Sequence, residues 1–223
     1  MPAVAPHVRQ TGAWVGGGFA AVLIVAGFLG LDRWFYEHVS LALNTEGIDR
    51  DFYHATGLFW LLFRAAFGYG LAGVVLGVVV IVLDPRRWRA IVAALLAVMV
   101  AGLLANVAQG TIGRLRPNQA DTHLAFVPPF TELLTKQRVS FPSGEAATGL
   151  ALACVLSRLF PCWRLVFYVG GTLAAVARLI NGAHYVSDVA AGGLFGVLVA
   201  GLVFRALRRY VERPSGQDDR RDS

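Results

Sequence analysis

The stretch AWVGGGFAAVLIVAGFLGL, residues 13–31, contains no charged side chain. An α-helix rises about 1.5 Å per residue, so about 20 apolar residues cross the hydrocarbon core of a bilayer. Five further apolar runs follow, at residues 58–83, 91–107, 146–160, 165–180 and 189–207. This pattern predicts an all-α, polytopic integral membrane protein with six transmembrane helices in one bundle.

The composition of the 223-residue chain favours the same class. It is 56% hydrophobic and 15% charged, whereas a soluble domain carries about 25% charged residues. The apolar excess excludes a disordered chain, collagen and a water-soluble globule. The net charge of +6 is compatible with a nucleic-acid partner or with a membrane surface. The two cysteines, Cys154 and Cys162, indicate neither a disulfide framework nor a metal site.

Basic residues divide unequally between the two sides of the predicted bundle. Six spans put both termini on one side, and 12 arginines fall there against 6 Arg and Lys on the other. The positive-inside rule therefore predicts cytoplasmic termini, with residues 109–145 and 181–187 facing the periplasm or exterior. The compact size and the composition rich in Arg, Ala, Gly and Val favour a multi-pass protein of a bacterial inner membrane. Most of the charge is thus explained by orientation, and no nucleic-acid partner is expected.

The chain divides into three parts on this interpretation. Residues 1–12 form a cytoplasmic N-terminus, 13–207 the six-span domain, and 208–223 a basic, disordered cytoplasmic tail. The first run is longer than a signal-peptide core of about 7–15 residues, so it is interpreted as a retained helix. Gly192 and Gly196 form a small-xxx-small pair, for which packing inside the bundle is favoured over a dimer. The oligomeric state stays open.

Three polar clusters interrupt the apolar pattern on the predicted outer side, at residues 109–118, 141–145 and 178–188. Ionisable groups at membrane depth are costly and indicate a functional site by default. In the second cluster Ser143 is placed to cap a helix, and the backbone N–H groups around Ser143 and Gly144 form a candidate anion site. An ordinary helix cap is the alternative.

The other two clusters contain cationic and titratable side chains. Arg116 is held extended by Pro117 and either grips a phosphate group bidentately or snorkels to the headgroups. Arg178 would add a second phosphate ligand. His184 and Asp188 would share a face if helical, so that the carboxylate fixes the imidazole tautomer and leaves the other nitrogen free to attack. A structural His–Asp pair is the alternative.

The order and spacing of these clusters resemble the motifs of the type 2 phosphatidic acid phosphatase family, membrane lipid phosphatases related to vanadium haloperoxidases. The family pattern is Lys, six residues, Arg-Pro; then Pro-Ser-Gly-His; then Ser-Arg, five residues, His, three residues, Asp. This chain has the matching sequence Arg116-Pro117, Pro142-Ser143-Gly144, and Arg178, His184 and Asp188 at the family spacing.

The resemblance implies an integral membrane lipid-phosphate phosphohydrolase with its site at the outer membrane face. His184 would attack phosphorus and form a phosphohistidine, while Asp188 would orient and stabilise His184. The phosphoryl oxygens would be held by Arg116, Arg178 and the N–H groups of Ser143 and Gly144. No metal and no cofactor are implied. The implied partners are the bilayer and a lipid phosphate such as phosphatidic acid, phosphatidylglycerol phosphate, polyprenyl pyrophosphate or lipid A.

Three positions depart from the family pattern. Gln109 stands where the family has Lys, Ala177 precedes Arg178 in place of Ser, and Glu145 replaces the His of Pro-Ser-Gly-His. That His resembles a general acid, a role that Glu takes only when protonated. Gln109 is kept as a candidate phosphate-binding residue and Glu145 as a candidate catalytic residue.

Glu145 leaves three interpretations open: a natural alternative acid or base, a divergent member with weak or no hydrolysis, or a substitution introduced to trap a state. His123 is a candidate substitute acid. Two other functions are alternatives to hydrolysis, namely a lipid phosphotransferase on the same scaffold and a non-catalytic lipid-binding or transport homologue.

Overall fold

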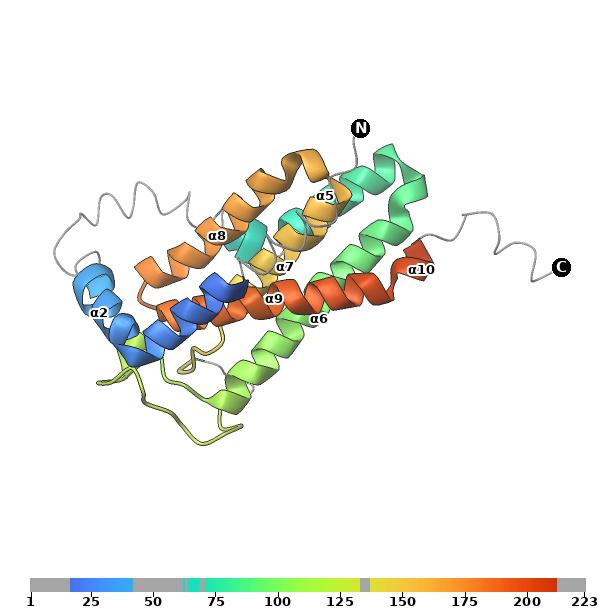
Figure 1. Cartoon of the computed structure of the whole chain (residues 1–223). Helices are drawn as coiled ribbons and strands as arrows, with labels where there is room; N and C mark the ends of the chain where they lie inside the picture. The colour runs from blue at the N-terminus through green and yellow to red at the C-terminus, as the bar shows by residue number, and fades with distance from the viewer. Residues whose placement is uncertain (1–16, 42–61, 63, 69–70, 133–136, 212–223) are drawn as a thin grey trace.

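The structure is a computed structural model that describes residues 17–41, 62, 64–68, 71–132 and 137–211 (Figure 1). The predicted N-terminus at 1–12 and residues 212–223 of the predicted tail lie outside the described residues. So does the segment 42–61, which holds most of the acidic residues expected in the first outer loop.

Helices make up most of the described chain. Residues 17–26 are α-helical and continue into η1 (Gly27–Leu31), α2 (Asp32–Phe35) and η2 (Tyr36–Ser40). The later helices are η3 (Arg64–Gly68), α5 (Leu71–Leu83), α6 (Trp88–Ile112), α7 (Gly144–Leu159), α8 (Arg164–Ile180), α9 (Val186–Ala206) and α10 (Arg208–Val211). Short 3-10 turns at η4 (Pro85–Arg87), η5 (Pro117–Gln119) and η6 (Pro161–Trp163) each begin with proline, whose fixed φ suits a helix start.

Four helices of the described chain are long and apolar enough to cross a membrane: Gly17–Ser40, Trp88–Ile112, Pro161–Ile180 and Val186–Ala206. α5 and α7 are shorter, with 13 and 16 residues. Exposed apolar side chains such as Leu29, Val82 and Leu202 line the outside of the bundle. Such a surface suits lipid rather than water. The protein is therefore an all-helical multi-pass membrane protein, and the count of six spans stays a prediction.

The first helix is longer than the apolar run that predicted it. The apolar run ends at residue 31, but the helix continues to Ser40 and includes Asp32 and Glu37. It bends at Gly30, which has a φ of 134° that glycine adopts without steric cost. Beyond the bend, an ion pair of 2.7 Å joins Arg33 Nε to Glu37 Oε1 one turn later, a spacing that supports a helix outside the bilayer.

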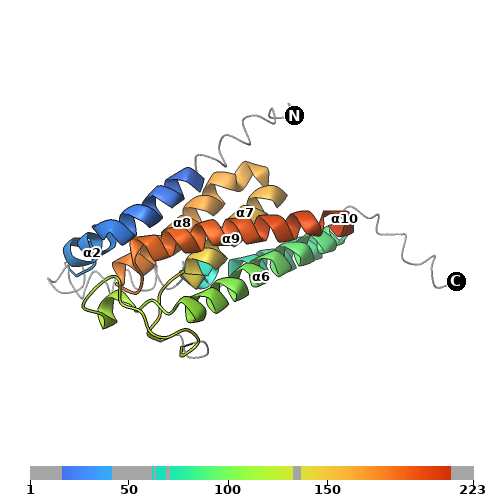
Figure 2. The same ribbon diagram turned by 60° about the horizontal axis from the view of Figure 1, so that its bottom comes forward.

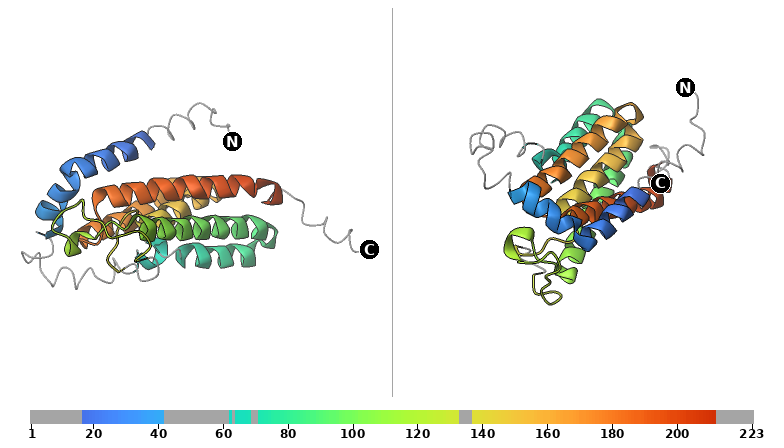
Figure 3. Two further views of the ribbon diagram at one scale, coloured as in Figure 1. Left: turned by 90° about the horizontal axis from the view of Figure 1, so that it is seen from below. Right: turned by 60° about the vertical axis from the view of Figure 1, so that its left-hand side comes forward.

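α7 is the central helix, and it packs against α6, α8 and α9. Figures 2 and 3 show α6, α8 and α9 side by side, with the loop that follows α6 gathered at one end beside α2. Gly192 and Gly196 lie where α9 meets α7, and a Cβ added there would collide with the carbonyl oxygens of Ser143 and Ala147. This contact confirms that the pair packs inside the bundle. It also holds the start of α9 against the start of α7.

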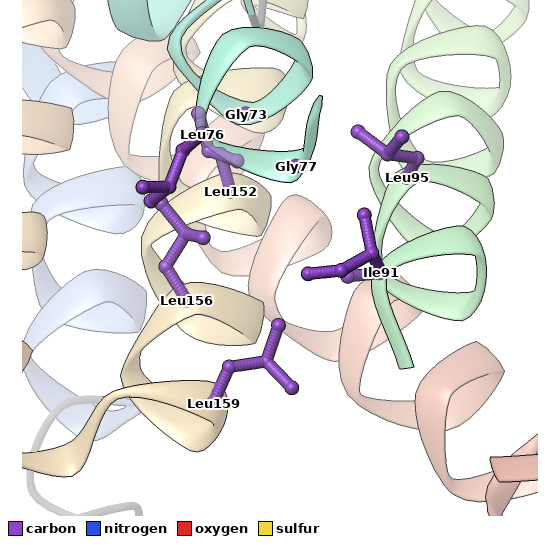
Figure 4. A pocket seen from close by; sticks show the side chains of 9 residues that line it. Gly73, Leu76, Gly77, Ile91, Leu95, Leu152, Leu156 and Leu159 are labelled. Atoms are coloured by element: carbon purple, nitrogen blue, oxygen red, sulfur yellow. The ribbon is translucent and has the colours of Figure 1, made fainter. Parts of the chain in front are cut away.

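A small apolar pocket lies at the opposite end of the bundle, near the start of α6 (Figure 4). Its volume of about 10 Å³ is room for roughly one water molecule. The lining is formed by Gly73, Leu76, Gly77, Ile91, Ala94, Leu95, Leu152, Leu156 and Leu159. With no polar side chain in that lining, the pocket is a packing defect between α5, α6 and α7 rather than a site for phosphate.

Candidate active site

The three polar clusters of the sequence meet at one end of the bundle. α6 and α8 end there, while α7 and α9 begin there, so each cluster occupies a helix terminus. Main-chain hydrogen bonds join the clusters: the Ser143 N–H donates to the Asp188 carbonyl at 3.0 Å, and the Ser140 N–H donates to the Arg114 carbonyl at 2.8 Å. The alternation of helix directions thus assembles a site from segments about 70 residues apart.

Ser143 and Gly144 begin α7. The Ser143 hydroxyl accepts the Ala146 N–H at 3.4 Å, so the side chain is an N-cap, as one of the two interpretations expected. A Cβ at Gly144 would lie 2.8 Å from Asn106 Oδ1, which explains a glycine at this position. The Ser143 N–H is already donated to the Asp188 carbonyl. This amide of the predicted anion site is therefore used within the protein.

Arg116 and Gln109 are anchored to the same backbone oxygen. Arg116 has extended φ/ψ of −68° and 153°, as the following Pro117 predicted. Its Nε donates to the Val139 carbonyl at 3.1 Å, and Gln109 Nε2 donates to that same carbonyl at 3.0 Å. Gln109, at the position of the family Lys, thus fixes the loop that carries Arg116.

Glu145 and Arg178 form an ion pair at the heart of the site. Glu145 lies in the first turn of α7 and Arg178 in the last turn of α8, and 3.5 Å separates Oε1 from Nε. Both side chains are largely buried. The departure from the family motif therefore brings a carboxylate against one of the two arginines predicted to bind phosphate.

His184 lies in the turn between α8 and α9, and it is buried. Its Nδ1 is 2.9 Å from the Ser140 carbonyl and 3.8 Å from Asp188 Oδ2. A carbonyl oxygen only accepts hydrogen bonds, so Nδ1 carries the proton and Nε2 of the neutral ring keeps its lone pair. Burial lowers the pKa of His184. Asp188 opposes this shift, and the charges of Arg178 and Arg116 add to it.

Asp188 is placed differently from the sequence expectation. α9 begins at Val186, so His184 precedes the helix and the two residues do not share a helical face. Asp188 Oδ2 instead accepts the Tyr185 N–H at 2.8 Å in a capping box. The nearest partner of the His184 ring is the Ser140 carbonyl, an acceptor that side-chain patterns do not reveal.

Two residues of the site, Arg114 and Asp32, were not predicted from the sequence. Arg114 is fully buried, and its Nη1 donates to Asp188 Oδ1 at 2.7 Å. Its Nη2 donates to Asp32 Oδ2 of the first helix at 2.9 Å. The available signal was weak: an acid directly after an uncharged span, and a second arginine two residues before Arg116.

His123, the candidate substitute acid, faces the first helix. Its Nε2 lies 3.2 Å from the Phe28 carbonyl, and its own carbonyl accepts two N–H groups of Arg114. Within the described residues, His123 therefore contacts Phe28 and Arg114 rather than Arg116 or Arg178.

The chain has relatives among known phosphatases. Lipid A 1-phosphatase of Rhizobium johnstonii is 37% identical over 111 residues, 48% of this chain and 45% of the relative. The enzyme of the same name from Rhizobium etli is 38% identical over 100 residues, 44% of this chain and 42% of that protein. A third, from Porphyromonas gingivalis, is 25% identical over 136 residues, 59% of this chain and 27% of its own length. The matches thus span less than half the length of these relatives.

A solved structure shares the fold. The first transmembrane PAP2 type phosphatidylglycerolphosphate phosphatase from Bacillus subtilis superposes with a TM-score of 0.61 at 20% identity, over 90% of this chain and 98% of that chain. Residues 90–212 match the model of the PAP2 superfamily, and this stretch holds all three motif clusters. The resemblance drawn from the motifs is confirmed, and the chain is a membrane protein of the PAP2 superfamily.

Proposed function

We propose that this protein is a lipid-phosphate phosphohydrolase whose nucleophile is Nε2 of His184. The observation that supports the proposal is the environment of that imidazole ring. Nδ1 is engaged by the Ser140 carbonyl, burial favours the neutral ring, and Arg116 and Arg178 both act on it electrostatically. A neutral imidazole beside two guanidinium groups is suited to attack a bound phosphate.

The reaction takes two steps. Nε2 of His184 attacks phosphorus, the bond from phosphorus to the lipid oxygen breaks, and the lipid oxygen leaves as an anion that takes its proton from water. Arg116 and Arg178 hold the phosphoryl oxygens. The phosphorylated ring is cationic, and the Asp188 carboxylate 3.8 Å away stabilises it. Water then attacks phosphorus, the P–N bond breaks, inorganic phosphate leaves and the neutral imidazole returns.

Glu145 fits the second step better than the first. Its ion pair with Arg178 favours a carboxylate, which accepts a proton from the attacking water but has none to give to a leaving oxygen. Without an acid for the first step, the site favours lipids whose oxygen departs readily as an anion, such as glycosyl phosphates and pyrophosphates. A lipid A-type 1-phosphate is therefore the first substrate to test, in agreement with the names of the three relatives.

The proposed site faces the periplasm or exterior. The opposite end of the bundle carries arginines at the helix boundaries, namely Arg87, Arg89, Arg158, Arg164, Arg205, Arg208 and Arg209. This bias supports cytoplasmic termini by the positive-inside rule. A lipid headgroup in the outer leaflet would then present its phosphate at the level of the site.

The test is phosphate release from a panel of lipid phosphates by the purified protein in mixed micelles. His184→Ala is expected to abolish turnover, whereas His38→Ala, an exposed histidine of the first helix, is expected to retain it. A radiolabelled lipid phosphate should leave an acid-labile, alkali-stable label on the native protein and none on His184→Ala. Turnover by His184→Ala, or no hydrolysis of any lipid phosphate by the native protein, would overturn the proposal.

A further inference from the structure

A network of buried charged side chains supports the site. Part of this network lies outside residues 90–212, which match the family model. Its members are Asp32, Arg114 and Asp188, of which Asp32 is 1% exposed and the other two are fully buried. Asp32 comes from the first helix, Arg114 follows α6 and Asp188 belongs to α9. The network therefore joins three separate parts of the chain.

The Arg114 guanidinium is held by several hydrogen-bond and ring partners. Besides the two carboxylates, Nη1 donates to Ser187 Oγ at 2.6 Å, while Nε and Nη2 donate to the His123 carbonyl at 2.9 and 2.7 Å. The rings of Phe28 and Tyr185 lie with centroids 4.6 and 4.2 Å from its guanidinium carbon. A planar cation with this many partners has one orientation.

Asp32 reaches beyond Arg114 to the start of α9. Its Oδ1 accepts the Ser187 N–H at 2.9 Å, and its Oδ2 accepts the Ser187 hydroxyl. Gly27 permits the close approach, since a Cβ there would lie 2.6 Å from Ser187 Cβ. A side chain from the first helix thus caps the helix that carries Asp188.

The charges in the network do not cancel. One guanidinium lies between two carboxylates, which leaves one formal negative charge next to the His184 turn. If Asp32 were neutral, the opposite charges of Arg114 and Asp188 would cancel. The network would then have no net negative charge to stabilise a cationic imidazole. This difference of one charge acts strongly on the imidazole, because the network is buried and few solvent dipoles screen it.

We propose that Asp32 is a positioning residue of the active site, acting through Arg114 and Ser187 to fix Asp188 and to keep a net negative charge beneath His184. The carboxylate of Asp188 is turned by Arg114 so that Oδ2 faces the Tyr185 N–H and the imidazole. Asp32 then serves both steps of the reaction, since the phosphorylated ring is cationic. The kinetic part of this inference rests on the proposed function.

The test is Asp32→Asn, which keeps the shape and removes the charge. Its matched control is Glu37→Gln, which neutralises an exposed carboxylate of the same helix that pairs with Arg33 one turn away. Asp32→Asn is expected to lower kcat about 10- to 100-fold with KM nearly unchanged, and the control to leave both values alone. Loss of affinity without loss of kcat, or native kinetics in both variants, would overturn the proposal.

A second readout does not depend on activity. The imidazole of His184 is followed by nitrogen NMR of histidine-labelled protein, with His184→Ala to assign the signal. Asp188, Arg178 and Arg116 act on this ring directly, and Asp32 acts on it through Arg114 and Asp188. Asp32→Asn is expected to move the His184 titration to lower pH, and Glu37→Gln not to move it. An unmoved titration in a folded Asp32→Asn protein would overturn the proposal even if the native protein were not a phosphatase.

Ser187→Ala covers the case in which Asp32→Asn does not fold. It removes the hydroxyl that links Asp32 to Arg114 and leaves every charge in place. A fall in kcat with unchanged KM would support the positioning role, and native kinetics would contradict it. Absence of phosphate release by the native protein, in the same assay, identifies failure of the proposed function instead.

Discussion

Glu145 Oε1 lies 3.5 Å from Arg178 Nε, so one of the three residues that depart from the family motif is paired with a motif arginine. A carboxylate in this position competes with phosphate for the guanidinium. The pair therefore links the unusual sequence of this protein to the affinity of its site for anions.

Glu145→Gln should strengthen the binding of inorganic phosphate. The amide keeps the shape of the side chain but no longer neutralises Arg178, so the inhibition constant for phosphate is expected to fall about 3- to 10-fold, a change of about 1 kcal/mol. Turnover is expected to fall in the same variant, because the base for the attacking water is lost. An inhibition constant that rises or stays the same would show that the ion pair does not oppose phosphate binding.

Substrates should be ranked by the acidity of their leaving group. Because the proposed first step has no general acid, a lipid glycosyl phosphate is expected to turn over at least about tenfold faster than an alkyl phosphate of equal chain length. Glu145→His restores the family residue and should narrow this ratio. The comparison needs kcat/KM for both substrates in the same micelles, and equal values in the native protein would contradict a site without an acid.

The acid limb of the pH profile should lie below pH 6.5. Burial lowers the pKa of His184 from its ordinary value of 6.5, so the ring stays neutral and nucleophilic as the pH falls through that value. Activity is lost only when the pH passes the lowered pKa and the lone pair is protonated. A profile of kcat/KM between pH 4.5 and 8 checks this, and an inflection above pH 6.5 would contradict it.

Gly196→Ala should destabilise the protein, since its Cβ would meet the backbone of Ala147, which has no flexible side chain to move aside. The expected cost is about 1–3 kcal/mol, visible as a lower midpoint of thermal unfolding in detergent. Gly18→Ala is the matched control, because an added Cβ at Gly18 has no atom within 4 Å among the described residues. Equal unfolding midpoints for the two variants would contradict a tight contact between α7 and α9.

Much of the fold and site follows from the sequence, and the reasons are visible in particular residues. Hydropathy located each run that became a helix, and the spacing of Arg116, Ser143, Arg178 and His184 identified the family. Motif residues are recognisable because each must keep its chemical type at a fixed separation from its neighbours.

What sequence could not supply were contacts that depend on the assembled fold. Asp32 and Arg114 are 82 residues apart and meet only when the first helix packs against α9. The acceptor for His184 Nδ1 is a backbone carbonyl, and every residue has one. The start of α9 at Val186 rather than at His184 follows from a cap formed by the Asp188 side chain, and a difference of two residues is within the usual error of boundary assignment.

The shared acceptor of Arg116 and Gln109 makes substitutions at these two positions interdependent. One carbonyl oxygen, that of Val139, receives both donors, and an oxygen offers two lone pairs. Replacing Gln109 by the Lys of the family pattern would thus disturb the tether of Arg116 as well as add a charge. Glu145 pairs with Arg178, which holds the same phosphate as Arg116 in the proposed site. Gln109→Lys and Glu145→His are therefore expected to be epistatic, so that their combined effect will not equal the sum of their separate effects.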